Sequence, residues 1–318
     1  FKGTAILSLS LILTKILGAV YLIPFYQIIG GEEQMALFNY GYSYYATILE
    51  ISGAGTPLAI AKLVAKYNAL GAYSVSRRIY KLGSWLLVVM GIVGFCILFF
   101  GSGYISDQIL ISNQQKFTPQ DGALVLKSLS FGIPLVLVSS GIRGLFQGHE
   151  IMLPSALSQF IEQVARIAFM LGATYFIMRV LGYGVVEGNV SATFAAAVGA
   201  VFSLITLFFF YSKNRKNLDF NIEEDEVQLD VSNTALVKEF FSVSIPFIFI
   251  PFHSTLFHFT PFRSIPFHPI PFQSFPLHSN TFHSTPFDAI QFHPLRFHLI
   301  PLDSVFYVRF HSISFDCI

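Results

Sequence analysis

The residues most able to do chemistry are charged side chains placed inside long apolar stretches. They are Lys15, Glu50, Arg143, Glu162 and Arg166. A charge at the centre of a bilayer costs about 2.5–3.5 kcal/mol on insertion scales, so each of them needs a physical reason. An arginine fork donates two parallel hydrogen bonds to phosphate and keeps its charge. We predict that Lys15, Arg143 and Arg166 bind an anionic group in a water-filled cavity.

Structural explanations compete with this prediction. Glu162 and Arg166 are one helical turn apart, so they can form an ion pair that neutralises both and holds two helices together. Lys15 could instead extend to the membrane surface. Glu50 is either a proton or cation site or the end of a broken helix. The sequence leaves these alternatives open.

A glycine-rich break interrupts the second apolar stretch at Gly53, Gly55 and Pro57. Broken helices are tolerated at membrane depth only where they face protein or a water cavity. Transporters use such breaks to present backbone groups to a substrate and to let a helix bend. The competing interpretation is a simple proline kink with close glycine packing.

Several other chemistries have no support in the sequence. No glycine-rich phosphate loop, Ser-His-Asp set or paired carboxylates are apparent, so we expect neither an enzyme nor a bound cofactor. Cys96 and Cys317 indicate neither a disulfide framework nor a metal site. The net charge is +1, with no basic run, so we expect no nucleic-acid partner.

The composition predicts the elements that must position these residues. Of the 318 residues, 53% are hydrophobic and only 12% are charged, against roughly 25% charged in soluble domains. A membrane-crossing helix needs about 20 mostly apolar residues. We therefore predict an all-α polytopic membrane protein. Its six predicted spans are Thr4–Ile29, Met35–Val64, Leu82–Gly101, Ala123–Phe146, Pro154–Leu181 and Val185–Tyr211.

Basic residues predict the orientation of these spans. They cluster between spans two and three and after span six, whereas the opposite loops hold few of them. Positive loops remain in the cytoplasm, so we expect a cytoplasmic N-terminus. The stretch from Lys66 to Arg78 is amphipathic, and we expect it to lie along the cytoplasmic surface against anionic lipid.

We expect four segments: six spans over 1–212, a polar cytoplasmic linker over 213–239, the start of a seventh span over 240–250, and a tail over 251–318. The tail repeats Phe, Pro and His with a period of five, and its prolines forbid a spanning helix. A pentapeptide-repeat β-solenoid is one interpretation. We favour a disordered or frameshift-derived low-complexity segment without a metal site. Because the chain opens on Phe1 and not on Met, we expect a fragment. We expect no cleavable signal peptide, because no small-residue cleavage pattern follows the first apolar stretch.

Three blocks of sequence carry a family resemblance. The first holds G-T-A-I-L and then K-I-L-G-A-V-Y from Lys15, and the second is G-A-G-T-P-L-A-I-A-K-L-V at 53–64. The third combines G-L-F-Q-G, M-L-P-S-A and S-Q over 144–159 with Glu162, Gln163 and Arg166. Residues 1–249 therefore resemble the stage V sporulation protein B-like polysaccharide-biosynthesis flippases of Gram-positive bacteria. These belong to the multidrug/oligosaccharidyl-lipid/polysaccharide exporter superfamily, and the lipid II flippases are relatives.

The resemblance implies a MATE-like fold of two pseudo-symmetric six-helix lobes around a central cavity, with this chain as the N-terminal lobe. It implies export of polyprenyl-diphosphate-linked glycan precursors by alternating access in a plasma membrane. It also places cations of the first helix and of the fourth-to-fifth region near the diphosphate. Lys15 stands where relatives often carry arginine, and Leu22 stands where some carry a second one. The repeat tail replaces the second lobe expected from about Phe240.

Two other functions compete with this prediction. A cation-coupled multidrug antiporter of the same superfamily would need an acidic and aromatic cavity, which the cationic set of Lys15, Arg143 and Arg166 disfavours. A fragment that does not transport is the second alternative, because one wall of the cavity would be missing. We expect the fragment to be inactive alone.

Overall fold

The computed structural model describes residues 2–53, 55–110, 117–214, 218, 227 and 231–245. Nearly all of them are helical, and these ranges contain no strand. The helices are α1 (Lys2–Val20), α2 (Leu22–Ile29), α3 (Glu32–Gly53), α4 (Thr56–Ala69), α5 (Tyr73–Phe100), α6 (Ser102–Leu110), α7 (Pro119–Ser130), α8 (Gly132–Gly148), α9 (Met152–Tyr175) and α10 (Val185–Asn214). A π-helical turn, Phe176–Val180, extends α9, and one more helix covers 233–245.

Six helical stretches of the described residues are long and apolar enough to cross a membrane. They are Ile6–Ile29, Glu32–Ala69, Tyr73–Phe100, Pro119–Gly148, Met152–Val180 and Val185–Asn214. The sequence-based prediction of an all-α polytopic membrane protein is therefore confirmed. The tail over 251–318 and the end of the expected seventh span, after Ile245, lie outside the described residues.

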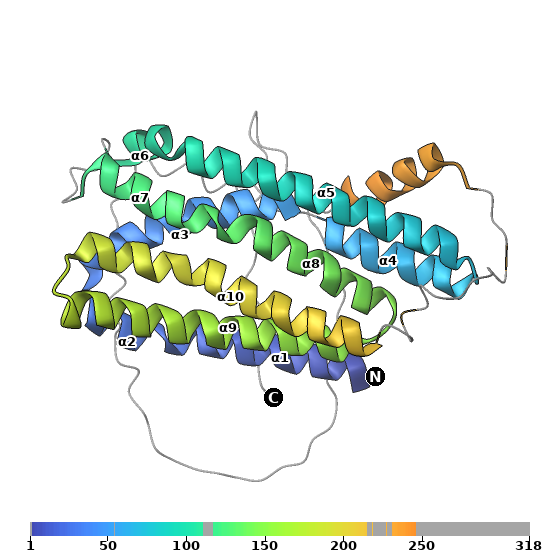
Figure 1. Ribbon diagram of the computed structural model, residues 1–318, viewed down its shortest axis with the longest axis horizontal. Coiled ribbons are helices and arrows are strands. Elements are labelled where there is room, and N and C mark those ends of the chain that lie inside the picture. Colours follow the sequence, from blue (N-terminus) through green and yellow to red (C-terminus); the bar gives the residue numbers. More distant parts are fainter. Residues whose placement is uncertain are drawn as a thin grey trace, which may run out of the picture. The chain divides into compact units, whose positions relative to one another are not determined.

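The helices pack side by side, and their order in space differs from their order in the chain (Figure 1). α9 and α10 lie together along their lengths, and α1 lies along α9. α8 packs against α10 on one side and against α4 and α5 on the other. α8 and α10 therefore lie in the middle of the bundle, and α9 lies beside them, so that the charged side chains of spans four and five can meet.

Side-chain size separates the inside of the bundle from its outside. Ala195, Ala200 and Ser203 of α10 are fully buried, and small residues of this kind let helices approach closely inside a membrane. The outer faces carry exposed large apolar side chains instead, such as Phe100, which is 77% exposed, and Phe209. An apolar exterior of this kind suits contact with lipid chains.

The break in the second span lies between α3 and α4. Gly55 has a φ of 72°, a left-handed conformation that glycine adopts without strain. Pro57 stands in the first turn of α4, where its missing N–H breaks no helical hydrogen bond. α8 covers the break closely, since a Cβ added at Gly144 would lie 2.6 Å from the carbonyl oxygen of Pro57. α8 therefore packs closely against one side of the break, at Pro57.

The amphipathic stretch predicted to lie on the membrane surface has another structure. α4 continues to Ala69, the chain turns over 70–72, and α5 begins at Tyr73. Ala72 and Val75 are fully buried in the core cluster that also holds Phe240 of the 233–245 helix. These apolar side chains pack against a later helix of the chain, so the stretch is a helix–turn–helix corner and not one amphipathic helix. Its position on the cytoplasmic surface stays a prediction.

The 233–245 helix docks on this α4–α5 turn through polar contacts. Glu239 accepts hydrogen bonds of 2.6 Å from both Lys66 Nζ and Tyr67 Oη, and Arg78 donates to Asn233. Burial opposes ionisation of Glu239, but the hydrogen bonds from Lys66 and Tyr67 outweigh it and lower the pKa of this carboxyl. The docked carboxylate is therefore ionised at neutral pH.

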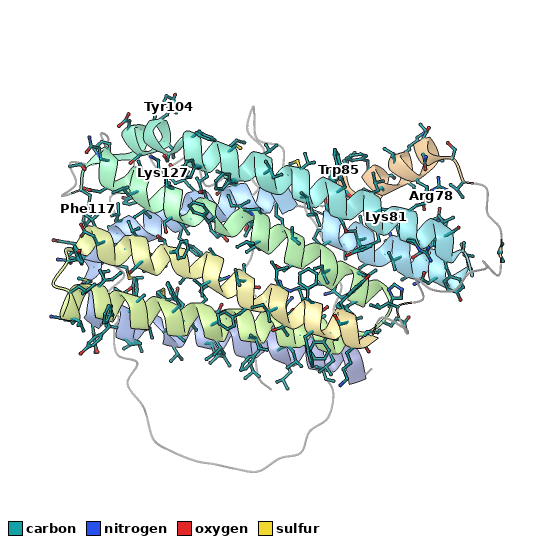
Figure 2. All side chains as sticks on the ribbon, in the orientation of Figure 1. Arg78, Lys81, Trp85, Tyr104, Phe117 and Lys127 are labelled. Atoms are coloured by element: carbon teal, nitrogen blue, oxygen red, sulfur yellow. The ribbon has the colours of Figure 1, made fainter. Side chains whose placement is uncertain are left out.

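Basic and aromatic side chains also lie along the N-terminal part of α5, which begins at the α4–α5 turn. Arg78, Lys81 and Trp85 follow one another along that end of the helix (Figure 2), and the side chain of Trp85 is 68% exposed. Tryptophan is enriched at the membrane–water boundary, because its ring is apolar and its N–H is polar. This composition is typical of a helix end at a membrane–water boundary.

Candidate functional site

Two arginines from neighbouring helices share one carboxylate inside the bundle. Arg143 of α8 donates to Glu162 Oε2, and Arg166 of α9 donates to Glu162 Oε1 over 2.6 Å. The side chain of Glu162 is 10% exposed, and those of Arg143 and Arg166 are 12% and 21% exposed. We call these three residues the triad. It joins α8 to α9 inside the bundle.

Hydroxyl groups from three helices complete the surroundings of the triad. The guanidinium of Arg143 donates to Ser158 Oγ over 3.0 Å and to Ser203 Oγ over 2.6 Å. Arg166 donates to the hydroxyl of Tyr42 over 3.4 Å, and its Nε is buried without a hydrogen-bond partner among the residues that the structure describes. Arg143 is therefore well satisfied, whereas Arg166 keeps unused donor capacity.

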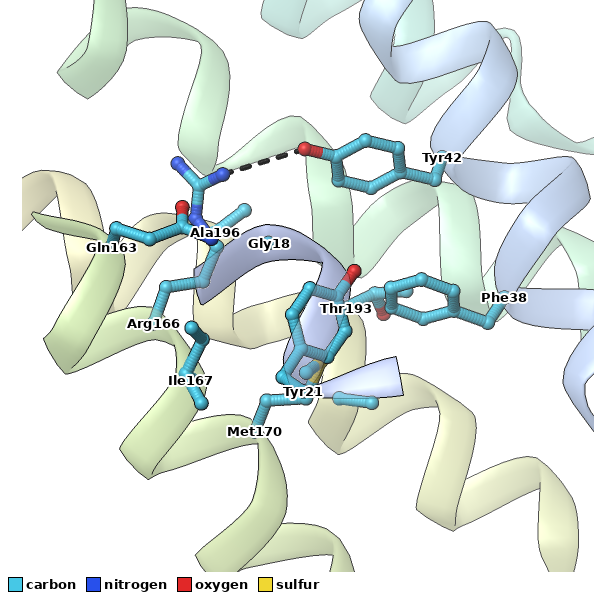
Figure 3. A pocket seen from close by; sticks show the side chains of 11 residues that line it. Gly18, Tyr21, Phe38, Tyr42, Gln163, Arg166, Ile167, Met170, Thr193 and Ala196 are labelled. Carbon is cyan, nitrogen blue, oxygen red and sulfur yellow. Dashed lines mark hydrogen bonds between the residues drawn. The ribbon is translucent and has the colours of Figure 1, made fainter. Parts of the chain in front are cut away.

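A cavity of about 200 Å³ lies beside Arg166. Residues of α1, α3, α9 and α10 line it, and Figure 3 shows the guanidinium of Arg166 reaching toward Tyr42 above Tyr21 and Phe38. Gln163 also lines the cavity and is only 9% exposed. The lining holds no carboxylate. The tyrosine, glutamine and threonine groups can both donate and accept, whereas the guanidinium of Arg166 only donates and carries a positive charge. The charge of Arg166 favours an anion over a cation.

The triad carries a surplus of positive charge. Two guanidinium groups face one carboxylate, and Glu162 is the only carboxylate within ion-pair distance of either arginine in the part of the chain that the structure describes. An unpaired buried charge costs several kcal/mol, by order of magnitude, unless an ion, water or ligand compensates it. The site can therefore attract a negatively charged group.

The structure does not bring all the candidate residues together. Lys15 lies on an exposed face of α1 and does not line the cavity, although Gly18 and Tyr21 of the same span do. Glu50 is exposed near the end of α3. Among the described residues, no three His, Cys, Asp or Glu side chains are grouped as a metal site would require.

Sequence reasoning missed several residues of the site. Tyr42 and Tyr21 come from α3 and from the turn after α1, and Ser203 comes from α10. A tyrosine or serine in an apolar helix gives little signal by itself, because its role depends on which helix lies opposite. Gln163 belongs to the third block of the family resemblance, but the sequence did not mark it as a residue of the site.

The sequence and the fold can be compared with those of known proteins. The family described as polysaccharide biosynthesis protein matches residues 1–260. The chain belongs to this family.

The lipid II flippase MurJ of Bacillus subtilis is 36% identical over 250 residues, covering 78% of this chain and 46% of the relative. Stage V sporulation protein B of the same organism is 28% identical over 247 residues, covering 77% of this chain and 45% of the relative. The chain thus spans about half the length of the curated relatives it matches.

Two solved transporters of the MOP superfamily share the fold. One is a multidrug resistance MATE family transporter in an outward-facing conformation, with a TM-score of 0.58 and 15% identity. The other is a transporter from Pyrococcus furiosus, with a TM-score of 0.56 and 17% identity. Each comparison covers 81% of this chain and 54% of the transporter. The predicted MATE-like architecture of the six spans is therefore confirmed.

Proposed function

We propose that the protein exports polyprenyl-diphosphate-linked glycan precursors for cell-wall or surface polysaccharide synthesis, as a carrier and not as an enzyme. The observation that carries the proposal is the surplus positive charge of the triad at membrane depth. A diphosphate head group supplies the negative charge that Arg143 and Arg166 lack. The similarity to the lipid II flippase MurJ of Bacillus subtilis supports the same class of substrate.

The proposal gives each cation a separate part. Arg166 lines the cavity, so it makes the direct contact with the anionic group. Arg143 is held by Glu162, Ser158 and Ser203, so it sets the position and charge of the triad. Lys15 lies on the exposed face of α1 and attracts the diphosphate as it enters. Alternating access would expose this site to the two sides of the membrane in turn.

The proposal includes an orientation. The basic residues from Lys62 to Lys81 lie at one end of the bundle, together with Lys213 at the end of α10. Positively charged ends face the cytoplasm, so the N-terminus is cytoplasmic in this proposal. The membrane is the plasma membrane of a Gram-positive bacterium, where anionic lipid would meet the same basic end.

A cation-coupled drug antiporter fits the cavity less well. A cationic substrate needs carboxylates or aromatic faces free of competing positive charge. The cavity offers aromatic rings, but it also offers the guanidinium of Arg166 and no carboxylate. An anionic substrate therefore matches the lining better.

A chimeric protein tests the proposed function. Residues 1–249 would replace the matching part of the Bacillus subtilis MurJ relative in a strain depleted of its own flippases. We expect restored growth, loss of export with Lys15→Ala or Arg166→Ala at normal membrane abundance, and no loss with the basic-end control Lys62→Ala. Full export by both variants, or a stable chimera without export, would refute the proposal.

A further inference from the structure

One outer face of α5 changes from basic to apolar along its length. Its side chains recur every three or four residues and therefore share one side of the helix; they are Arg78, Lys81, Trp85, Val88 and Ile92. Trp85 is 68% exposed, and Val88 and Ile92 are 40% and 53% exposed. Figure 2 shows that the cations precede the ring along the helix. We call these five residues the α5 stripe.

The two cations at the start of the stripe are not neutralised within the bundle. Among the described residues, neither Arg78 nor Lys81 has a carboxylate within ion-pair distance. Arg78 donates to Asn233, whose side chain is neutral. A guanidinium has five N–H donors, so Arg78 keeps its charge and other donors for a further partner. Residues three apart on a helix have Cβ atoms about 5–6 Å apart, so one anionic group can contact both cations.

The 233–245 helix adds a polar group beside Arg78. Asn233 accepts from Arg78 through its side-chain oxygen, so its exposed amide N–H groups are still able to donate. The helix is held along α5 at this place, because Phe240 is fully buried and a Cβ added at Gly83 would lie 3.1 Å from its ring. The start of the stripe is therefore bordered by donors from two helices.

The order of groups along the stripe matches that of a phospholipid. Cations hold a phosphate oxygen by charge-assisted hydrogen bonds, a tryptophan ring suits the boundary between head group and acyl chain, and apolar side chains suit the acyl chain itself. We propose that the α5 stripe is a binding site for one anionic phospholipid, with its phosphate on Arg78 and Lys81, its glycerol region at Trp85, and its acyl chain along Val88 and Ile92.

The charge of the stripe selects the class of lipid. Two cations without a carboxylate attract a head group with a net negative charge, whereas a zwitterionic head group brings an ammonium that both of them repel. The inference goes beyond the general attraction of a basic end to a membrane, since it assigns the lipid to particular side chains. It does not depend on the proposed export function, because lipid binding requires no transport.

Trp85 makes this site directly observable, because it is the only tryptophan of the chain. The full chain would be reconstituted in vesicles that mix phosphatidylglycerol with phosphatidylcholine, with bromine on the acyl chains of one lipid at a time. Bromine quenches the fluorescence of a tryptophan that the labelled lipid contacts. From the two titrations, we expect Trp85 to prefer phosphatidylglycerol by about fivefold or more, since one surface cation near anionic lipid changes binding by about that factor.

Single-charge variants test the assignment to Arg78 and Lys81. Arg78→Gln and Lys81→Gln should each lower the preference for phosphatidylglycerol by about fivefold. Lys62→Gln is the matched control, since it removes one exposed positive charge from α4, outside the stripe, and should keep the preference of the wild type. Lys81 is exposed, so Lys81→Gln still decides if Arg78→Gln does not fold.

Two competitors separate the possible sources of phosphate. Soluble glycerol 3-phosphate, added at constant ionic strength, should leave the quenching unchanged, because it has no acyl chain to lie on the stripe. Relief of quenching by it would mean that the cations bind free phosphate. Relief by a polyprenyl phosphate at a mole fraction far below that of the phospholipid would assign the stripe to a lipid-linked substrate. Either result would overturn the proposal.

The preference itself gives the remaining decisive outcomes. Equal quenching of the wild type by the two brominated lipids would overturn the proposal, as would an unchanged preference in both Arg78→Gln and Lys81→Gln. A loss in Lys62→Gln as large as theirs would reduce the effect to the general charge of the surface and would overturn it too.

Discussion

Gly199 of α10 lies directly against Arg166 of α9. A Cβ added at Gly199 would stand 3.0 Å from Arg166 Cβ and 2.8 Å from the carbonyl oxygen of Glu162. The absence of a side chain at this position lets α10 pass close to α9. The close passage covers the stem of Arg166 and directs its guanidinium toward Glu162 and the cavity.

Gly199→Val should therefore move α10 away from the triad. Overpacking of this kind costs about 1–3 kcal/mol, because the helix backbone on the other side cannot give way as a flexible side chain would. Gly172→Ala on α9 is the matched control, since a Cβ there meets nothing within 4 Å. Thermal unfolding in detergent should show a lower midpoint for Gly199→Val and an unchanged or higher one for Gly172→Ala. Equal midpoints would contradict the close contact.

Glu162→Gln should be among the most destabilising single changes in the bundle. It leaves the guanidinium groups of Arg143 and Arg166 without a carboxylate, and loss of one partner of a buried pair costs about 3–5 kcal/mol. The yield of monodisperse protein and its unfolding midpoint measure the effect. Glu50→Gln removes the same charge from an exposed position and should have little effect.

A double variant checks the electrostatic origin of that loss. Adding Arg143→Gln to Glu162→Gln removes one of the two unpaired cations, so the pair of changes should cost less than the sum of the single ones. Strict additivity would mean that packing, and not charge, explains the effect of Glu162→Gln.

Glu239 should make the docking of the 233–245 helix dependent on pH. Its pKa is lowered from the usual 4.5 in the folded state, so the unfolded chain takes up a proton first as the pH falls. The stabilisation by Glu239 is therefore complete above the usual pKa and is lost as the pH falls through the lowered folded value. We expect the midpoint difference between wild type and Glu239→Gln to be constant near neutral pH and to close under acidic conditions.

The size of this difference should be modest. The side chain of Lys66 is 51% exposed and that of Glu239 is 29% exposed, and exposed ion pairs contribute about 0–1 kcal/mol. Lys81→Gln removes another exposed charge, in the N-terminal part of α5, so it serves as the control. A difference between wild type and Glu239→Gln that grows as the pH falls would contradict the assigned sign.

Cysteine labelling should reveal the orientation of the spans. In a background of Cys96→Ser and Cys317→Ser, we expect Glu33→Cys to react with an impermeant maleimide on intact cells. Leu70→Cys, at the opposite end of the span Glu32–Ala69, should react only after permeabilisation. The reverse pattern would place the N-terminus outside and contradict the distribution of basic residues.

The sequence alone determined the class of the protein and the length of its elements. Long apolar stretches with few charges admit only membrane-spanning helices, because a backbone in lipid must satisfy its own hydrogen bonds. The spacing of Glu162 and Arg166 by four residues placed both on one face of α9, and the local preferences of Gly55 and Pro57 predicted the break between α3 and α4.

Only the tertiary structure decided which helices meet. Arg143 lies 19 residues before Glu162, and Ser203 lies 60 residues after Arg143, so no local rule joins them. The same holds for Tyr42, which reaches Arg166 across 124 residues. Helix neighbours are set by the fit of small and large side chains over whole surfaces. That fit assembles the triad and its cavity, and it leaves Lys15 on the outer face of α1.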